Sequence, residues 1–136
     1  MLKMEEVLYH LPKFFSAGSV SHTFYDLYFT EEELVVAFMG DTYRAYFVRA
    51  NDPGYNRREE YKELTIEEIK KNHDKNLLFS AKKIKEIHCK RGSFFKNPNI
   101  TIKTSDGDLC LYSKNKNIPF EELNKSIPTN YHLKID

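Results

Sequence analysis

The sequence has no tryptophan, only two cysteines and no long apolar run. Two cysteines cannot form a disulfide framework, so the class of small disulfide-stapled secreted proteins is excluded. The longest apolar run, Leu34–Met39, is far shorter than the roughly 20 residues that a membrane-spanning helix needs. The N-terminal stretch MLKMEEVLYH has no basic region followed by an apolar run, so we expect no signal peptide. Together these absences predict a cytoplasmic protein without a transmembrane segment.

The two cysteines are predicted to stay unpaired. Cys89 alternates in phase with Ile87, which directs it toward a core, whereas Cys110 is out of phase with Leu109 and Leu111. Side chains that point to opposite faces of a sheet are poorly placed for a disulfide, and free thiols suit a reducing cytoplasm.

Net charge is also nearly absent. The chain of 136 residues has 21 Lys and Arg against 20 Asp and Glu, a formal charge of +1. No global field therefore draws the protein to nucleic acid or to an anionic membrane, so such binding depends on a local patch. With 40% hydrophobic and 30% charged residues, the composition is that of a globular chain rather than a disordered one. We expect a single domain over residues 1–136.

Motifs that carry catalysis or bind cofactors are missing as well. The chain has no H-E-x-x-H, no C-x-x-C, no G-x-S-x-G and no glycine-rich phosphate loop. His88 and Cys89 are neighbours on a predicted strand, so their side chains point to opposite faces and cannot act as a dyad. Asp106 and Asp108 flank a turn glycine, but a calcium loop needs more oxygen ligands at regular spacing. The sequence therefore predicts a protein that is not an enzyme and holds no metal or cofactor.

The clearest local pattern is a β-hairpin near the C-terminal end. Ile100–Thr104 and Asp108–Ser113 both alternate apolar and polar residues, which gives each strand one apolar face. Between them, Asp106-Gly107 favours the positive backbone dihedrals of a tight turn. This pattern predicts a hairpin with Gly107 in its turn.

The other patterns predict mainly β structure with helices. Thr65 and Glu68 form a capping box, which predicts a short helix over Ile66–Asn72. Pro119 opens a segment with one apolar face, which predicts a final helix. The full order is three strands (about 5–11, 23–29 and 34–39), a mostly helical insertion (42–75), four strands (77–79, 86–91, 100–104 and 109–113) and a C-terminal helix (119–127).

Seven short antiparallel strands followed by one helix is the order of a pleckstrin-homology (PH)-like barrel. LYFTEEELVV at residues 27–36 resembles the strand–Thr–turn–strand signature of GRAM and bacterial PH-like domains. FSAKKIKEI at 79–87 and RREEYKELTIEEI at 57–69 are similar to segments of the same domains, the second in prokaryotic members. The resemblance implies a seven-stranded antiparallel barrel of two packed sheets, with a capping helix and a helical insertion between strands three and four. Lipid-specific reading is not implied, because the first strand–strand loop offers Lys13 and little else.

One local patch is basic and aromatic, and it is the candidate anion-binding site. Cations interleaved with aromatic rings suit anionic headgroups or stacked nucleic-acid bases. A simpler interpretation is favoured, in which the cations form the solvated face of a half-buried strand and the phenylalanines fold back onto one end of the barrel. The patch comprises Lys82, Lys83, Lys85, Lys90, Arg91, Phe94, Phe95 and Lys96.

These features favour a non-catalytic PH-like interaction module that binds a protein or peptide, or a second copy of itself. We expect a groove between a barrel edge and the final helix, where a partner adds a strand. The alternative is a peripheral binder of anionic lipid or nucleic acid that uses the Lys82–Lys96 patch, with nucleic acid the less favoured ligand. An enzyme with its site in the 42–75 insertion is the third hypothesis.

Overall fold

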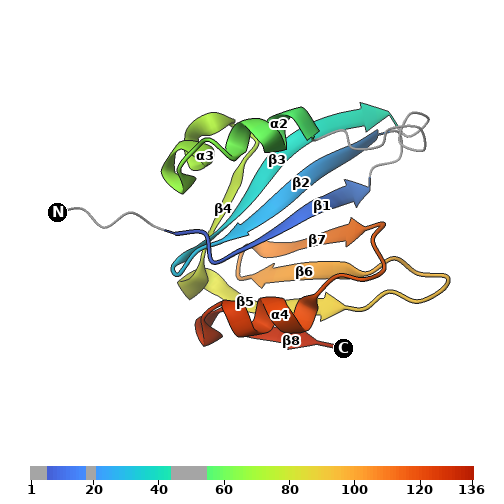
Figure 1. Cartoon of the computed structure of the whole chain (residues 1–136). Coiled ribbons are helices and arrows are strands. Elements are labelled where there is room, and N and C mark those ends of the chain that lie inside the picture. The colour runs from blue at the N-terminus through green and yellow to red at the C-terminus, as the bar shows by residue number, and fades with distance from the viewer. Residues whose placement is uncertain (1–5, 18–20, 44–54) are drawn as a thin grey trace.

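The computed structural model describes residues 6–17, 21–43 and 55–136. In these residues eight strands form one mixed sheet in the order β4-β3-β2-β1-β7-β6-β5-β8 (Figure 1). The strands are β1 (Tyr9–Ala17), β2 (Ser21–Phe29), β3 (Glu33–Tyr43), β4 (Leu77–Ser80), β5 (Ile84–Lys90), β6 (Asn99–Thr104), β7 (Gly107–Ser113) and β8 (Leu133–Ile135). The described helices are α2 (Tyr55–Tyr61), α3 (Ile66–Asn72) and α4 (Phe120–Ser126), with 3-10 turns η1 (Ala81–Lys83) and η2 (Thr129–Tyr131).

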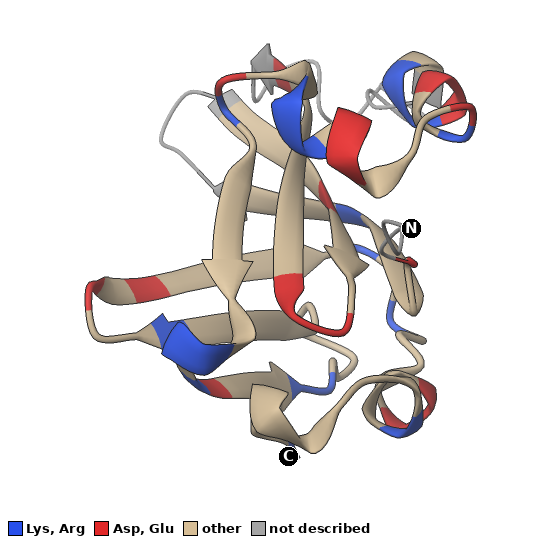
Figure 2. Cartoon of the chain, turned by 90° about the vertical axis from the view of Figure 1, so that its left-hand side faces the viewer, with Lys and Arg blue, Asp and Glu red and all other residues tan. Residues whose placement is uncertain are grey.

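The sheet is folded into two halves that enclose the main core. β1 pairs with β2 along most of its length but with β7 only at Phe14 and Phe15, so the sheet bends at this junction. Figure 2 shows the strands of the two halves crossing steeply. The apolar faces of both halves meet inside, and residues from each half are fully buried there: Leu27, Phe29, Leu34, Val36, Ile87, Ile100, Ile102 and Leu111.

The protein is mainly β with helices, but the closed seven-stranded barrel is not observed. The additional strand, β8, pairs in parallel with β5. Its three residues are too few to produce a recognisable periodicity, so sequence patterns missed it. Among the described residues no backbone pairing joins β4 to β8, and the eight strands therefore form one open sheet rather than a barrel of two separate sheets.

β1 differs most from its predicted course. We expected the strand to end before Pro12, yet β1 continues to Ala17 and its register shifts between Leu11 and Phe14. Lys13 adopts a left-handed conformation with φ of 66° in this interval. The bulge accommodates a proline that cannot donate a ladder hydrogen bond, so the strand resumes beyond it.

The predicted 42–75 insertion contains α2 and α3, although β3 continues to Tyr43 and residues 44–54 lie outside the described part of the chain. The two helices cover the outer face of β2 and β3, where Tyr61, Ile66 and Ile69 pack on a second apolar cluster. The predicted capping box is confirmed, because Thr65 Oγ1 accepts from the Glu68 N–H at 3.2 Å. Glu68 Oε1 in turn accepts from the Thr65 N–H at 3.0 Å.

The hairpin and the final helix are also confirmed. β6 and β7 keep the alternation expected of them, and Thr104 pairs with Gly107, the first residue of β7. The turn itself is Ser105-Asp106, and of the predicted Asp106-Gly107 pair only Gly107 has a positive φ, of 133°. α4 begins directly after Pro119 and buries its apolar stripe of Phe120 and Leu123 against the main core. None of the helices in the described ranges is long and apolar enough to cross a membrane.

We predict that Leu123→Ala lowers the free energy of unfolding by about 2–5 kcal/mol, because the Leu123 side chain is fully buried (0% exposed) and truncation leaves a cavity. Urea denaturation measures this change. Asn124→Ala, at the exposed neighbouring position of the same helix, is the matched control and should change the value by less than about 0.5 kcal/mol. Equal effects of the two substitutions would contradict the packing of α4 on the core.

Candidate functional site

The phenylalanines of the predicted patch lie in a tight turn within the β5–β6 loop. The Ser93 N–H donates to the Lys96 carbonyl at 2.9 Å, and the Lys96 N–H donates back to the Ser93 carbonyl at 3.3 Å. Phe94 and Phe95 therefore occupy the two central positions of the turn. We call residues Ser93–Lys96 the aromatic turn.

Both rings of the aromatic turn face solvent. Phe94 and Phe95 are each 89% exposed, and neither belongs to an apolar cluster of the core. Their ring centroids are 4.9 Å apart, with the ring planes at 85°, so each ring contacts chiefly the other. In Figure 1 the loop between β5 and β6 projects beyond the right-hand end of the sheet. The interpretation in which these phenylalanines fold back onto the body of the protein is therefore wrong.

The rest of the loop is held in place by contacts with the end of β7 and with the linker that follows it. Gly92 is required here, because a Cβ at that position would lie 2.7 Å from Cδ of the buried Pro98. The Pro98 carbonyl accepts from the Ser113 N–H at 3.1 Å. Lys116 Nζ donates to the Lys96 carbonyl at 2.7 Å and to Asn97 Oδ1 at 3.1 Å. These contacts position the aromatic turn before any partner binds.

Basic residues lie on both sides of the aromatic turn along the chain and in the linker that contacts it through Lys116. Five exposed basic residues come from the β5–β6 loop region and from the linker between β7 and α4, and we call them the cationic collar: Lys90, Arg91, Lys96, Lys114 and Lys116. Residues 90–98 and 109–118 contain no Asp or Glu. The Arg91 guanidinium pairs with Glu121 of α4 and donates from Nη1 to the Asp136 carbonyl at 3.3 Å, so its charge is partly neutralised.

The remaining patch residues lie elsewhere. Lys82 and Lys83 are in η1 and Lys85 is at the bulge where β5 begins. At roughly 3.3 Å per residue, the length of β5 separates Lys82 and Lys83 from Lys90 by about 20 Å and Lys85 from Lys90 by about 17 Å. Figure 2 views the molecule from this opposite end. The structure therefore brings Lys90, Arg91, Phe94, Phe95 and Lys96 together but leaves the other three cations apart.

The outward face of β5 between the two groups is neutralised by ion pairs. Glu86 lies within 3.3 Å of Lys103 Nζ and 3.0 Å of Lys134 Nζ, and these two lysines lower its pKa. His88 Nε2 contacts Asp136 Oδ2 at 2.8 Å. The basic patch, which is continuous in sequence, is therefore interrupted in space by a stretch of β5 whose charges are paired.

Cys89 faces the core directly beneath this surface. Its side chain is fully buried, and burial raises the pKa of the thiol to about 12. A thiol in this environment stays protonated near neutral pH and is a poor nucleophile. The inward position of Cys89 and the outward position of His88 agree with the prediction from strand alternation.

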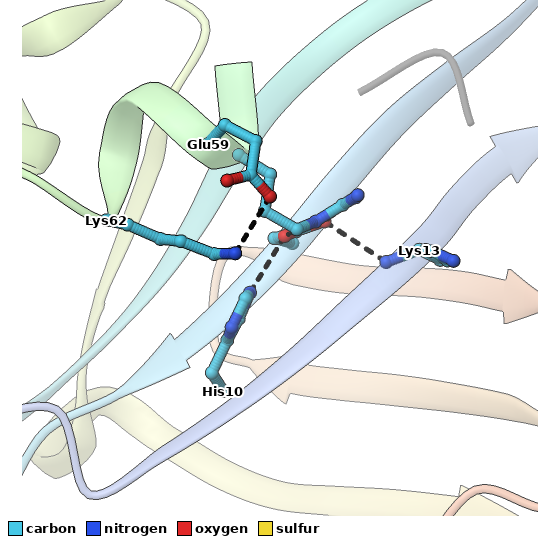
Figure 3. A network of polar contacts seen from close by, with 6 residues as sticks. His10, Lys13, Glu59 and Lys62 are labelled. Carbon is cyan, nitrogen blue, oxygen red and sulfur yellow. Dashed lines mark hydrogen bonds and ion pairs between the residues drawn. The ribbon is translucent and has the colours of Figure 1, made fainter. Parts of the chain in front are cut away.

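A second polar cluster, which sequence patterns missed, lies beneath α2. Asp26 of β2 is fully buried, and Arg58 of α2 donates from Nε and Nη2 to its two carboxylate oxygens at 2.5 and 2.7 Å. His10 Nε2 lies 2.8 Å from Asp26 Oδ2, and the left-handed Lys13 donates its N–H to Oδ1 at 3.1 Å (Figure 3). The only hint in the sequence is one acidic residue within the apolar run TFYDLYF.

This cluster attaches the helical layer to the sheet. Burial would raise the pKa of Asp26, but the hydrogen bonds and positive charge of Arg58 and His10 outweigh burial and hold the pKa below its usual value of 3.8. The carboxylate is therefore ionised at neutral pH, with both oxygens engaged by neighbours. Its contacts are those of a structural clamp, whereas the aromatic turn is the candidate site for an external partner.

We predict that Asp26→Asn lowers the free energy of unfolding at pH 7 by about 3–5 kcal/mol, because the largely buried Arg58 guanidinium loses its carboxylate. Since the folded-state pKa of Asp26 is depressed, its stabilising contribution is complete above pH 3.8 and is lost as the pH falls through the lower folded-state value. The gap between wild type and variant should therefore shrink below about pH 4.

Urea denaturation at pH 7 and at successively lower pH measures this gap. Glu59→Gln is the control, because the exposed Glu59–Lys62 pair at 2.8 Å contributes at most about 1 kcal/mol. A gap of the same size at every pH would contradict the role assigned to the Asp26 carboxylate.

No family, curated protein or solved structure matches this chain.

Proposed function

We propose that this chain is a non-catalytic interaction module whose contact surface is the aromatic turn. The observation that carries the proposal is the 89% exposure of Phe94 and Phe95 at the tip of a braced loop. Turns favour Gly, Asn, Asp, Ser and Pro at such positions, so turn formation gives no reason for two phenylalanines. Leaving a phenylalanine side chain in water instead of burying it forgoes about 1.5–3 kcal/mol. Contact with a partner recovers that free energy.

We further propose that the fold is PH-like. The antiparallel order from β4 to β5, followed by a helix that packs on the core, supports this assignment. β8 and the open sheet are additions to the expected pattern. In this arrangement the aromatic turn connects two strands of the sheet, β5 and β6, and is not attached to the helical layer.

The position of β8 favours the aromatic turn over strand addition as the binding mode. We expected a free groove beside the final helix, but β8 already pairs with the edge of β5 from Ile87 to Cys89. A partner strand at this edge would first have to displace β8. The aromatic turn needs no rearrangement to make contact, and a preorganised surface binds at a lower entropic cost.

We predict that replacing Phe94 and Phe95 together by Ser leaves the free energy of unfolding within about 0.5 kcal/mol of wild type, because the rings support nothing in the core. Solubility in ammonium sulfate should rise, since apolar surface is removed. The chain offers a matched control in its other Phe-Phe pair, Phe14 and Phe15, which are 0% and 6% exposed.

Replacing that buried pair by Ser should prevent cooperative folding, since each truncated core phenylalanine costs about 3–5 kcal/mol. Thermal and urea denaturation distinguish the two double variants. A loss of more than about 1 kcal/mol in the Phe94/Phe95 variant would assign the rings a structural role and overturn the proposed function.

A further inference from the structure

The end of the molecule that carries the aromatic turn is cationic as well as apolar. The cationic collar gathers five basic residues there, on a chain whose formal charge is only +1. The β2–β3 turn with Glu31, Glu32 and Glu33 lies at the opposite end, toward the viewer in Figure 2. The opposite end also carries Lys82, Lys83 and Lys85, so what distinguishes the end with the aromatic turn is that its loop residues 90–98 and linker residues 109–118 carry these basic residues with no Asp or Glu among them.

We propose that the aromatic turn inserts into the headgroup region of an anionic lipid bilayer and that the cationic collar binds the headgroups around it. This inference rests on the proposed function, because it names the partner of the same surface. An apolar tip with a basic surround has the two components of interfacial membrane binding, which combines burial of rings at the acyl boundary with attraction to anionic lipid. Each added cation near such a surface strengthens binding about five-fold.

The shape and chemistry of the surface favour a bilayer over a protein partner. Phe94 and Phe95 form a small projecting tip, whereas a stable protein interface spans a broad complementary surface of about 800 Å² on each partner. Lysine is depleted in protein interfaces, yet lysines dominate the collar. A bilayer can be entered by a projecting tip without a shaped pocket, and its anionic headgroups attract the lysines of the collar.

The ring geometry also disfavours single-stranded nucleic acid. Such ligands stack successive bases on aromatic faces. Phe94 and Phe95 are nearly perpendicular, at 85°, so the edge of one ring faces the plane of the other and the two do not form a parallel stacking platform. Nucleic acid would therefore bind only through the cations, weakly, and Phe94 and Phe95 would not take part.

The contacts that hold the aromatic turn in place favour its insertion into the headgroup region. Lys116 holds the loop through the Lys96 carbonyl and Asn97, and Gly92 allows Pro98 to pack against it. The loop therefore does not have to be ordered when it enters the headgroup region, which lowers the entropic cost of binding. Insertion would place the β7–α4 linker at the membrane and the acidic β2–β3 turn away from it.

Co-sedimentation with vesicles tests the inference, using phosphatidylcholine vesicles with and without phosphatidylserine. Wild type should sediment with the anionic vesicles only, and less so at high salt. Phe94 and Phe95 replaced together by Ser should weaken binding at least ten-fold. Lys90 and Lys96 replaced together by Ser should weaken it roughly 25-fold, at about five-fold for each cation. Lys82 and Lys83 replaced by Ser provide a control with the same charge change at the far end of β5.

The absence of tryptophan supplies a second, direct readout. Phe95→Trp creates a single reporter whose emission should shift to shorter wavelength on adding anionic vesicles, because the indole leaves water. Leu78→Trp is the matched control at another exposed apolar position, 52% exposed in β4, and its emission should not shift. Depth-dependent quenching by brominated lipids should affect the first reporter and not the second.

Several results would overturn the inference. They are equal binding to neutral vesicles, equal loss in the Lys82/Lys83 variant, no blue shift of the Phe95→Trp reporter, or binding of a single-stranded oligonucleotide or a protein to the turn without binding of vesicles. If wild type ignores vesicles while the Phe94/Phe95 variant folds normally, the bilayer is excluded and the interaction module stands. If that variant unfolds, both proposals fall.

Discussion

The bulge in β1 is the feature on which the rest of the fold depends. Before it, β1 pairs with β2 in one register, and after it Phe14 and Phe15 pair with both β2 and β7. These two residues are therefore the hinge that joins the halves of the sheet around the main core. The same bulge turns the Lys13 N–H toward Asp26 and completes the hydrogen bonding of a buried carboxylate. One local irregularity thus supports both the enclosed core and the attachment of the helical layer.

The protein separates the residues that stabilise it from those available to a partner. The stabilising groups lie inside the fold. They are the buried ion pair of Asp26 and Arg58, the two apolar clusters and the apolar face of α4. The aromatic turn lies outside all of them and contributes no core contact. This separation permits two phenylalanines to be presented to solvent without weakening the fold, and it makes stability and binding independently measurable.

β8 changes how the edge of the sheet can be used. In parallel pairing with β5 it satisfies backbone groups that would otherwise form an open edge. Lys134 adds an ion pair to Glu86, and Asp136 adds a side-chain contact to His88. A covered edge is protected against uncontrolled strand addition. The loop at the end of β5, rather than its edge, is then the accessible part of this strand.

Short-range patterns in the sequence determined the local features of this structure. The 100–113 hairpin, the capping box of Thr65 and Glu68, the helix after Pro119 and the opposite orientations of Cys89 and Cys110 depend on residues a few positions apart, and all are present in the structure. The sequence predicts the candidate site in part, since Lys90, Arg91, Phe94, Phe95 and Lys96 follow one another closely in the chain.

Only the tertiary structure decided the rest, because the interactions that stabilise these features are made between residues far apart in the chain. Asp26 and Arg58 are 32 positions apart, and nothing in the neighbourhood of either residue identifies its partner. β8 exists because β5 offers an edge, and β1 passes Pro12 because β2 and β7 hold both sides of the bulge. The division of the basic patch follows from the extended geometry of β5. The exposure of Phe94 and Phe95 follows from a turn that the folded sheet carries out into solvent.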